Sequence, residues 1–246
     1  MAMELDRVRA LLLADGRLRA AINYGNPVLA QRGPAGEPKG VSVALAGELA
    51  RRLDAQLEIV PFEIAGAVVE AAGDDRWDVA FLAVDPQRAD RVTFTAPYVL
   101  IEGTYLVQEQ SPYRVVEALD APGLRIAVGE GAAYDLVLTR MLKHAQILRY
   151  VTSVAAVQAF LDGKTHAAAG VRQPLEAAAR KYAGLRVLPG RFTAIEQAMA
   201  VPAAKKDAAA FLQTFLSEML DSGFVARVLE DTGQDPGLAA LARTDR

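Results

Sequence analysis

Arg88 is the residue of this sequence best placed to do chemistry. It follows the apolar run Val79–Leu82, which is typical of a strand buried on both faces, and it comes just after a turn signal at Asp85-Pro86. Residues beyond the carboxyl end of a buried parallel strand lie at the crevice where open α/β sheets bind ligands. A guanidinium in that crevice offers a planar fork that holds a carboxylate through two hydrogen bonds. The alternative is a surface arginine paired with Asp85 or Asp90.

A glycine turn, Gly129-Glu130-Gly131, is the second candidate. It follows one predicted strand and opens a predicted helix, so it leaves N–H groups at a helix N-terminus, where a carboxylate binds favourably. A dinucleotide site is excluded, because Tyr134 stands where the third glycine would be and no acidic residue follows where a ribose partner is expected. A tight turn that needs glycine only for its backbone is the alternative. For Tyr134, a position facing a ligand and a position packed on its own helix both stay open.

Other polar residues follow predicted strands or lie near them. Asn23, Tyr24 and Asn26 come where the first strand ends, and an ordinary loop explains them as well as a ligand role does. Glu196 is either a ligand contact or a solvated residue at a strand end. The predicted ligand-binding residues are Arg88, Asn23, Tyr24, Asn26, Ala83, Asp85, Gly131, Ala132, Ala133, Tyr134, Arg172, Gln173 and Glu196.

The composition excludes several classes of protein. The chain has 246 residues, a net charge of −3 and no cysteine. It therefore has no electrostatic footprint for nucleic acid, no disulfide, no cysteine-bound zinc and no thiol catalysis. Neither His144 nor His166 has a second ligand at metal-like spacing, so no cofactor is expected. The longest apolar stretches are too short to span a bilayer. The first residues do not resemble a signal peptide, which leaves a mature exported form or a cytoplasmic protein.

Two successive series of strands and helices are predicted to position these residues. The first series comprises helices at 4–15, 41–53 and 65–72 and strands at 19–24, 57–62 and 79–82. The second comprises strands at 125–128, 147–151 and 166–169 and helices at 132–144 and 153–162. Such alternation predicts a parallel, doubly wound sheet in each of two lobes.

The two lobes are expected to be joined twice. Extended runs at 101–107 and 196–201 are the predicted crossings. A helix at 203–220 and a last helix from Phe224 follow the second crossing. We therefore predict that lobe one consists of residues 1–106 plus 198–246 and lobe two of residues 107–197.

Three segments resemble motifs of the bacterial solute-binding proteins of family 3, the receptors for polar amino acids. They are Arg88–Tyr98, Gly40–Leu45 and Val128–Tyr134, and the resemblance extends over about residues 18 to 232. It implies the type II periplasmic binding protein fold, in which two doubly wound α/β lobes are joined by two hinge crossings. It also implies that Arg88 clamps the carboxylate of a ligand. In the family an aromatic residue often stacks on the ligand where this chain has Asn26.

One departure from the family affects the expected ligand. Amino-acid receptors carry an aspartate for the α-ammonium of the ligand, and this chain has Val171 there, beside Arg172. Because an unpaired buried charge is expensive, we expect a carboxylate without an α-ammonium, such as a dicarboxylate held by Arg88 and Arg172. Asp85 or Glu196 is the alternative source of the missing anion.

The function implied by the resemblance is that of a monomeric periplasmic receptor. Its lobes would close on a small carboxylate-bearing metabolite, an amino acid or organic acid, and present it to the permease of an ABC importer. No catalysis, nucleic acid or membrane insertion is implied. The alternatives are an enzyme resembling cyclohexadienyl dehydratases, with Glu196 or Asp85 as the acid, and a cytoplasmic small-molecule sensor. The fold alone cannot choose among the three.

Overall fold

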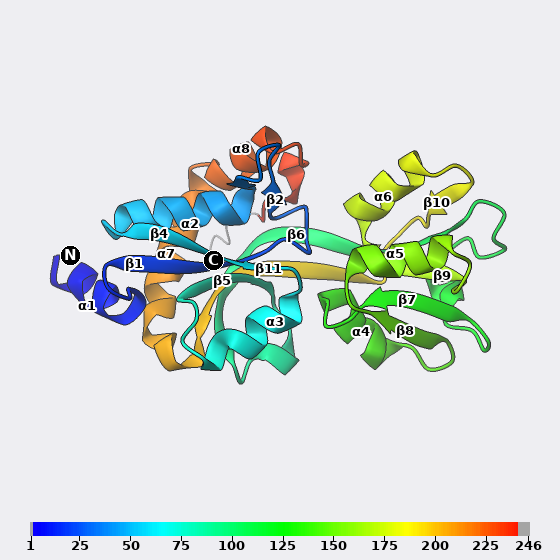
Figure 1. Ribbon diagram of the computed structural model, residues 1–246, viewed down its shortest axis with the longest axis horizontal. Coiled ribbons are helices and arrows are strands. Elements are labelled where there is room, and N and C mark those ends of the chain that lie inside the picture. Colours follow the sequence, from blue (N-terminus) through cyan, green and yellow to red (C-terminus); the bar gives the residue numbers. More distant parts are fainter. Residues whose placement is uncertain (1, 241–246) are drawn as a thin grey trace, which may run out of the picture. The chain divides into compact units, whose positions relative to one another are not determined.

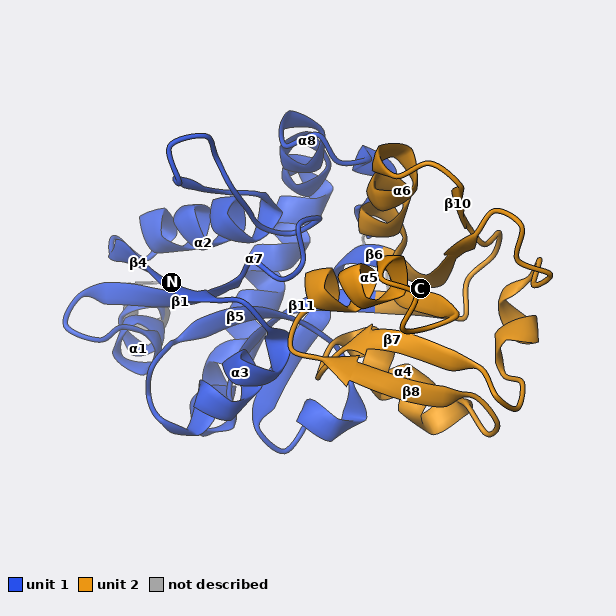
Figure 2. Ribbon diagram, turned by 45° about the vertical axis from the view of Figure 1, so that its right-hand side comes forward, with its two compact units in different colours: residues 1–100, 196–246 blue, residues 101–195 orange. Residues whose placement is uncertain are grey.

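The chain folds into two compact units connected by two strands. The computed structural model describes residues 2–240. Unit 1 combines residues 1–100 with 196–246, and unit 2 is the continuous stretch 101–195 (Figure 2). Strand β6 (Val92–Gln108) carries the chain out of unit 1, and strand β11 (Thr193–Pro202) carries it back. The predicted fold class, two α/β lobes joined by two crossings, is confirmed.

The limits of the two units lie inside these crossing strands. Unit 2 begins at Ile101 and ends at Ile195, a few residues before the expected limits at 107 and 197. The assignment of lobes with those limits stays a prediction. Residues 241–246, which belong to the predicted first lobe, lie outside the described part of the chain.

Unit 1 is built on three parallel strands. Strand β1 (Arg17–Asn23) lies between β4 (Gln56–Phe62) and β5 (Val79–Ala83). Strand β11 pairs with the other side of β5 in antiparallel orientation. Every residue of β5 is buried, as expected of a strand covered on both faces.

Helices cover both faces of the unit 1 strands. They are α1 (Ala2–Leu12), α2 (Val41–Arg52), α3 (Ala65–Glu70), α7 (Ala209–Asp221) and α8 (Phe224–Asp231). Helices α2 and α3 lie on opposite sides of the strands (Figure 1). This is the doubly wound arrangement that the alternation of strands and helices predicts.

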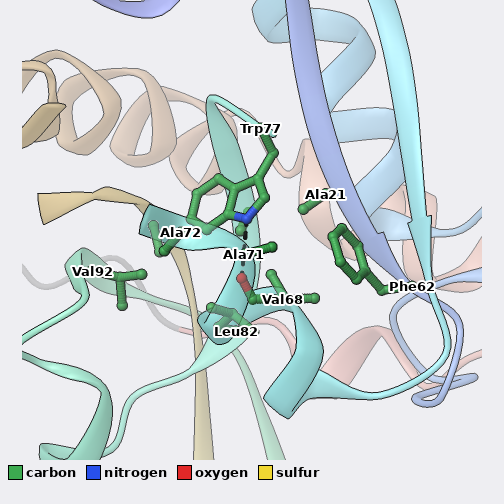
Figure 3. Close-up of a cluster of buried hydrophobic side chains, with 10 residues drawn as sticks. Ala21, Phe62, Val68, Ala71, Ala72, Trp77, Leu82 and Val92 are labelled. Atoms are coloured by element: carbon green, nitrogen blue, oxygen red, sulfur yellow. Dashed lines mark hydrogen bonds between the residues drawn. The ribbon is translucent and has the colours of Figure 1, made fainter. Parts of the chain in front are cut away.

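Trp77 is at the centre of the core beneath α3. It is fully buried, and its indole N–H donates to the carbonyl of Val68 at 3.0 Å (Figure 3). The other buried side chains of this cluster are Ala21, Phe62, Val68, Ala71, Ala72, Ala80, Leu82, Val92 and Ala200. Burial of a large aromatic side chain with its one polar group satisfied contributes about 3 kcal/mol to stability.

Unit 2 repeats the parallel arrangement on a smaller scale. Strand β7 (Arg125–Gly129) lies between β8 (Gln146–Tyr150) and β9 (Ala167–Val171). Strand β6 pairs antiparallel with β9 and with β10 (Leu185–Val187). The helices of this unit are α4 (Ala133–Met141), α5 (Ser153–Leu161) and α6 (Arg172–Lys181).

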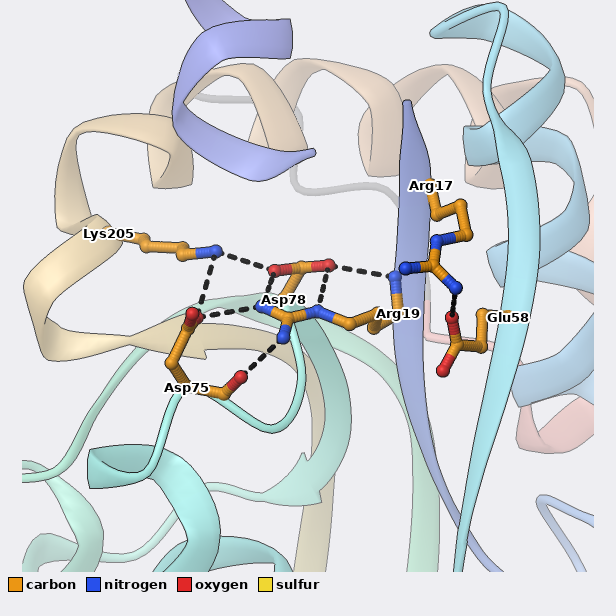
Figure 4. A network of polar contacts seen from close by, with 6 residues as sticks. All are labelled: Arg17, Arg19, Glu58, Asp75, Asp78 and Lys205. Atoms are coloured by element: carbon orange, nitrogen blue, oxygen red, sulfur yellow. Dashed lines mark hydrogen bonds and ion pairs between the residues drawn. The ribbon is translucent and has the colours of Figure 1, made fainter. Parts of the chain in front are cut away.

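A charged network joins the amino ends of β1 and β5. Asp78, which has no exposed surface, accepts from the backbone N–H of Arg19 at 2.8 Å and from its guanidinium Nη2 at 2.8 Å. The Nζ of Lys205 lies 2.5 Å from the same carboxylate, and Asp75 also pairs with Arg19 (Figure 4). The hydrogen bond to Asp78 raises the pKa of the Arg19 guanidinium. Two cations thus compensate the buried carboxylate, which would otherwise be costly.

Lys205 also explains a difference from the predicted helix at 203–220. Residues Ala203–Ala208 form a 3₁₀ segment, η4, in which Lys205 has φ −105° and ψ 18°, and the α-helix begins at Ala209. The contact between Lys205 and Asp78 accompanies this local departure from helical geometry, so tertiary structure overrides helix propensity.

Other helix ends also differ from the sequence prediction. Helix α1 stops at Leu12 and not at Asp15, because Asp15 and Gly16 have φ values of 50° and 75° and form a turn. Helix α4 stops at Met141, since the carboxylate of Asp120 accepts the next N–H groups, from Lys143 onward, at 2.8–3.1 Å.

Four of the α-helices and strands in the described part of the chain have no counterpart in the predicted series. They are β2 (Gln31–Arg32), β3 (Pro38–Lys39), α6 and β10. Strands β2 and β3 form a separate antiparallel pair. Across the described part of the chain, the helices lack either the length or the apolar character needed to cross a bilayer.

Candidate functional site

Arg88 lies at the carboxyl end of β5, in the short 3₁₀ segment η2 (Pro86–Arg88). Its side chain is almost entirely buried, with 3% of the residue exposed. The guanidinium Nη1 donates to the carbonyl of Ala83 at 2.9 Å. Burial lowers the pKa of Arg88 to about 10, and the negative charge of Asp85 opposes that shift. Arg88 is therefore a cation at neutral pH, held at the end of the strand as expected.

Asp85 shapes the turn that carries Arg88. It is 3% exposed, and its Oδ1 accepts the backbone N–H of Gln87 at 2.9 Å, so it caps η2. The backbone N–H of Arg88 in turn donates to the carbonyl of Asp85 at 3.0 Å. Proline at the first position of this segment fits the missing N–H of that position. Asp85 thus has a structural task that accounts for its burial.

The end of β5 is also tied to the returning strand β11. Ala83 is opposite Gln197 in the antiparallel ladder, and the N–H of Val84 donates to the carbonyl of Glu196 at 2.8 Å. The residue Glu196 is exposed. The backbone of Glu196 is therefore fixed beside the end of β5, while the residue remains exposed.

Three polar residues at the carboxyl end of β1 or just beyond it, Asn23, Tyr24 and Asn26, have partners within unit 1. The Oδ1 of Asn23 accepts the N–H of Gly25 at 3.0 Å, and the Oδ1 of Asn26 accepts the N–H of Val28 at 3.3 Å. These are turns of the kind that asparagine side chains commonly form. Tyr24 is half-buried, and burial raises the pKa of its phenol. The guanidinium of Arg32 lies 3.9 Å above the centre of the Tyr24 ring.

The parallel strands of unit 1 bring these groups to one edge of the sheet. Asn23 is opposite Phe62, and Ala21 is opposite Ala80. The residues after β1, β4 and β5 therefore leave the sheet on the same side, because parallel strands have their carboxyl ends together. Glu63, which follows β4, is a charged residue of this edge that the sequence analysis did not select.

In unit 2 the glycine turn after β7 is confirmed as a turn before a helix. Gly131 has φ 68°, a left-handed conformation that suits glycine, and its N–H donates to Asp135 Oδ2 at 3.0 Å. Helix α4 begins at Ala133, with Ala132 as its cap residue and no side-chain hydrogen bond at that cap.

Tyr134 packs within unit 2. It is 3% exposed, and its hydroxyl lies 2.7 Å from Ser153 Oγ and accepts the N–H of Gly129 at 3.1 Å. Burial raises the pKa of the Tyr134 phenol. These contacts, with the end of β7 and the start of α5, favour a packed position for Tyr134 over one that faces a ligand.

Arg172 begins helix α6, directly after β9, and is paired with acidic residues of unit 2. Its Nε lies 2.7 Å from Glu102 Oε2, and its Nη2 donates to the carbonyl of Gly190 at 2.5 Å. Arg191 Nη1 lies 2.9 Å from the other oxygen of Glu102. These two arginines, Arg172 first, lower the pKa of Glu102. We call Glu102, Arg172 and Arg191 the Glu102 cluster.

Gln173, the next residue of α6, has a buried Oε1 with no hydrogen-bond partner among the described residues. A buried carbonyl oxygen without a partner is uncommon. Within the described residues, no group of three or more His, Asp and Glu side chains is arranged to hold a metal ion.

The fold and the position of these residues define a class of protein. Two doubly wound α/β units joined by two crossing strands, with polar residues at the carboxyl edge of each parallel sheet, are the architecture of type II periplasmic binding proteins. Residues 18–232 match the family of bacterial extracellular solute-binding proteins, family 3. The chain belongs to this family, as the sequence motifs predicted.

Known relatives include both an enzyme and binding proteins. A cyclohexadienyl dehydratase of Pseudomonas aeruginosa is 30% identical over 164 residues, which are 65% of this chain and 59% of the enzyme. The match thus spans less than two thirds of the enzyme's length.

Two solved structures illustrate the similarity in fold. The cysteine-binding protein from Campylobacter jejuni has a TM-score of 0.79 at 20% identity, over 93% of this chain and 92% of that one. A putative binding component of an ABC transporter from Wolinella succinogenes, complexed with lysine, has a TM-score of 0.77 at 23% identity, over 89% of this chain and 96% of that one. At such identities the likeness concerns the fold.

Proposed function

We propose that this protein is the receptor of an ABC-type importer and that it closes its two lobes on a small carboxylate-bearing metabolite. The observation that carries the proposal is Arg88, a cation buried at the carboxyl end of β5. A guanidinium in this position is suited to a carboxylate, because its fork of donors matches the two oxygens. Membership in the solute-binding family supports the same reading.

Transport follows from binding without covalent chemistry. The empty receptor favours an open form, and a ligand that contacts both lobes shifts the population towards a closed form. The closed receptor would then present its ligand to a membrane permease. The family name supports a periplasmic location.

We propose that the ligand lacks an α-ammonium group. Val171, at the end of β9, has an apolar side chain where amino-acid receptors have an aspartate. Arg172 is not a good second anion-binding cation, because Glu102 already neutralises it. The preferred ligand class is therefore an organic acid held by Arg88.

A thermal-shift screen with organic acids and amino acids tests the proposed function. A ligand at 100 times its dissociation constant adds about 2.7 kcal/mol to the free energy of unfolding. A hit that is lost in Arg88→Ala and retained in Arg91→Ala, an exposed arginine nearby, supports the receptor. A complete panel without any stabilising carboxylate contradicts it.

The dehydratase-like enzyme is a second candidate, favoured by the 30% identity to cyclohexadienyl dehydratase. It requires a carboxylic acid of raised pKa in the site. The two candidate acids differ in their surroundings, because Asp85 is buried and caps η2 while Glu196 is exposed. Turnover of prephenate or arogenate that disappears in Asp85→Asn or Glu196→Gln would establish the enzyme instead of the receptor. A cytoplasmic sensor would bind the same ligand without a partner permease.

A further inference from the structure

Tyr24 and Glu63 form a pair of neighbouring groups at the carboxyl edge of unit 1. Tyr24 follows β1 and Glu63 follows β4, and the N–H of Tyr24 donates to the carbonyl of Phe62 at 2.8 Å. The two strands are therefore still paired where these side chains begin. An aromatic face beside a carboxylate is the chemistry that recognises a guanidinium, through the ring face and through charged hydrogen bonds.

A guanidinium from the same chain already occupies this pair. The central carbon of Arg32 lies 3.9 Å from the centre of the Tyr24 ring, and its Nη2 lies 2.7 Å from Glu63 Oε1. Arg32 thus makes with Tyr24 and Glu63 both contacts that a bound guanidinium ligand would make.

The hairpin that carries Arg32 fixes it over the ring. Arg32 ends β2 and pairs with Pro38 of β3, and the N–H of Gly33 donates to the carbonyl of Glu37 at 2.8 Å. The hairpin returns through Gly40, where φ is 114° and an added Cβ would lie 2.4 Å from the carbonyl oxygen of Leu29. The short β2–β3 hairpin therefore restricts the position of Arg32.

The contact of Arg32 with Tyr24 and Glu63 is weak by itself, but it is favoured because the hairpin holds Arg32 close to both residues. The side chains of Arg32 and Glu63 are 49% and 65% exposed, and exposed ion pairs are strongly screened. Because Arg32 is tethered to the same chain, it nevertheless competes with free cationic ligands for Tyr24 and Glu63 at an effective concentration of about millimolar. A free cation that binds the pair weakly cannot displace it.

We propose that Arg32 is a specificity-determining residue, which fills a guanidinium subsite formed by Tyr24 and Glu63 and so excludes ligands with a cationic distal group. This inference rests on the proposed function, because it assigns the subsite to the ligand edge of unit 1. Strand β1 lies between β4 and β5, so the subsite belongs to the same row of strand ends as Arg88. The ligands that remain are carboxylates with a neutral or anionic distal group.

Titration calorimetry with 5-guanidinopentanoate and 5-ureidopentanoate tests the inference, because both carboxylates lack an α-ammonium group. The two have the same length and differ only in the distal group, a cationic guanidinium in the first and a neutral ureido group in the second. We expect Arg32→Ala to gain about tenfold in affinity for the guanidinium compound relative to the ureido compound. Arg32→Lys, which keeps a cation over the ring, should show no such gain. The gain should disappear in the double variant Arg32→Ala, Tyr24→Leu.

The outcomes separate the inference from the proposed function. If the wild-type protein binds a carboxylate through Arg88 and Arg32→Ala melts cooperatively but gains nothing for the guanidinium compound over the ureido compound, the subsite does not exist. If Arg32→Lys gains as much as Arg32→Ala, space and not charge excludes the ligand, and the inference is wrong. If no carboxylate binds the wild-type protein, the proposed function fails first and the inference fails with it.

Discussion

Arg88 and Arg172 are two arginines in similar places with different surroundings. Each follows a buried strand, β5 in unit 1 and β9 in unit 2. Arg88 is 3% exposed and donates to the carbonyl of Ala83, the last residue of its own strand. The side chain of Arg172 is 21% exposed and is held by the carboxylate of Glu102. Position after a strand thus selects candidate residues at the carboxyl edge of each parallel sheet, while burial and partners distinguish one arginine from the other.

The Glu102 cluster has a structural role of its own. Glu102 belongs to β6 close to the start of unit 2, and Arg191 precedes β11 close to its end. Arg172 donates both to Glu102 and to the carbonyl of Gly190. It therefore fastens together, within unit 2, the two chain segments that lead to the crossings.

Replacing Arg88 should have the largest effect on binding. Arg88→Ala leaves the ligand carboxylate unpaired in a dry site, which should cost on the order of 2–5 kcal/mol of binding free energy, at least about a thirtyfold loss. Because Arg88 is buried and donates to Ala83, the variant should also lose about 1–3 kcal/mol of stability. Calorimetry and urea unfolding measure the two effects. Normal binding by a folded Arg88→Ala would remove Arg88 from the site.

Ligand charge provides the second test of the comparison. If the unit 2 edge has no anion for an ammonium group, 2-oxoglutarate or glutarate should bind more tightly than glutamate, by about 1–3 kcal/mol. Glu102 is not available as that anion, because two arginines already hold it. Titration calorimetry with matched pairs measures the difference. Tighter binding of the amino acid in every pair would reveal an ammonium site.

Replacing Arg172 should affect stability more than binding. Arg172→Ala removes one of the two cations of Glu102 and should destabilise the protein by about 1 kcal/mol. Ligand affinity should change by less than about threefold, since the residue acts inside unit 2. A loss of affinity as large as that of Arg88→Ala would contradict the contrast between the two arginines.

The smallest expected effect is a pH dependence at Glu102. Its pKa is lowered in the folded protein, by Arg172 first, so its stabilising contribution is present above its unfolded pKa of about 4.3 and is lost as the pH falls through the folded value. At pH 7 the free energy of unfolding of the wild-type protein should exceed that of Glu102→Gln by about 0.5–1 kcal/mol, after allowance for solvent screening. Unfolding curves between pH 7 and pH 3 should show the gap closing. If this difference in free energy of unfolding grew as the pH fell, the pKa of Glu102 would be raised in the folded protein and not lowered.

The sequence predicted most of the fold, because the apolar periodicity of its strands and helices is local. The place of Arg88 was also predictable, since a buried strand followed by Asp85-Pro86 defines it. The pairing of Arg172 with Glu102 was not, because the two residues are 70 positions apart in the sequence. The contact of Arg32 with Tyr24 depends on a hairpin with two residues in each strand, which is too short for a periodic signal. Lys205 lies in the 3₁₀ segment that replaces the start of a well-patterned helix, and its contact with Asp78 spans 127 positions, which propensity cannot foresee.

The return of β11 into unit 1 sets an order for folding on the ribosome. Strand β5 is made long before its partner β11, because the whole of unit 2 is translated between them. Translation proceeds at roughly 5–20 residues per second, so one edge of the nascent β5 stays unpaired for several seconds. An unpaired edge of an apolar strand promotes aggregation. Unit 2 is uninterrupted, so all its strands emerge within that interval. Limited proteolysis of stalled nascent chains should find unit 2 protected before β5, and the reverse order would contradict this sequence of events.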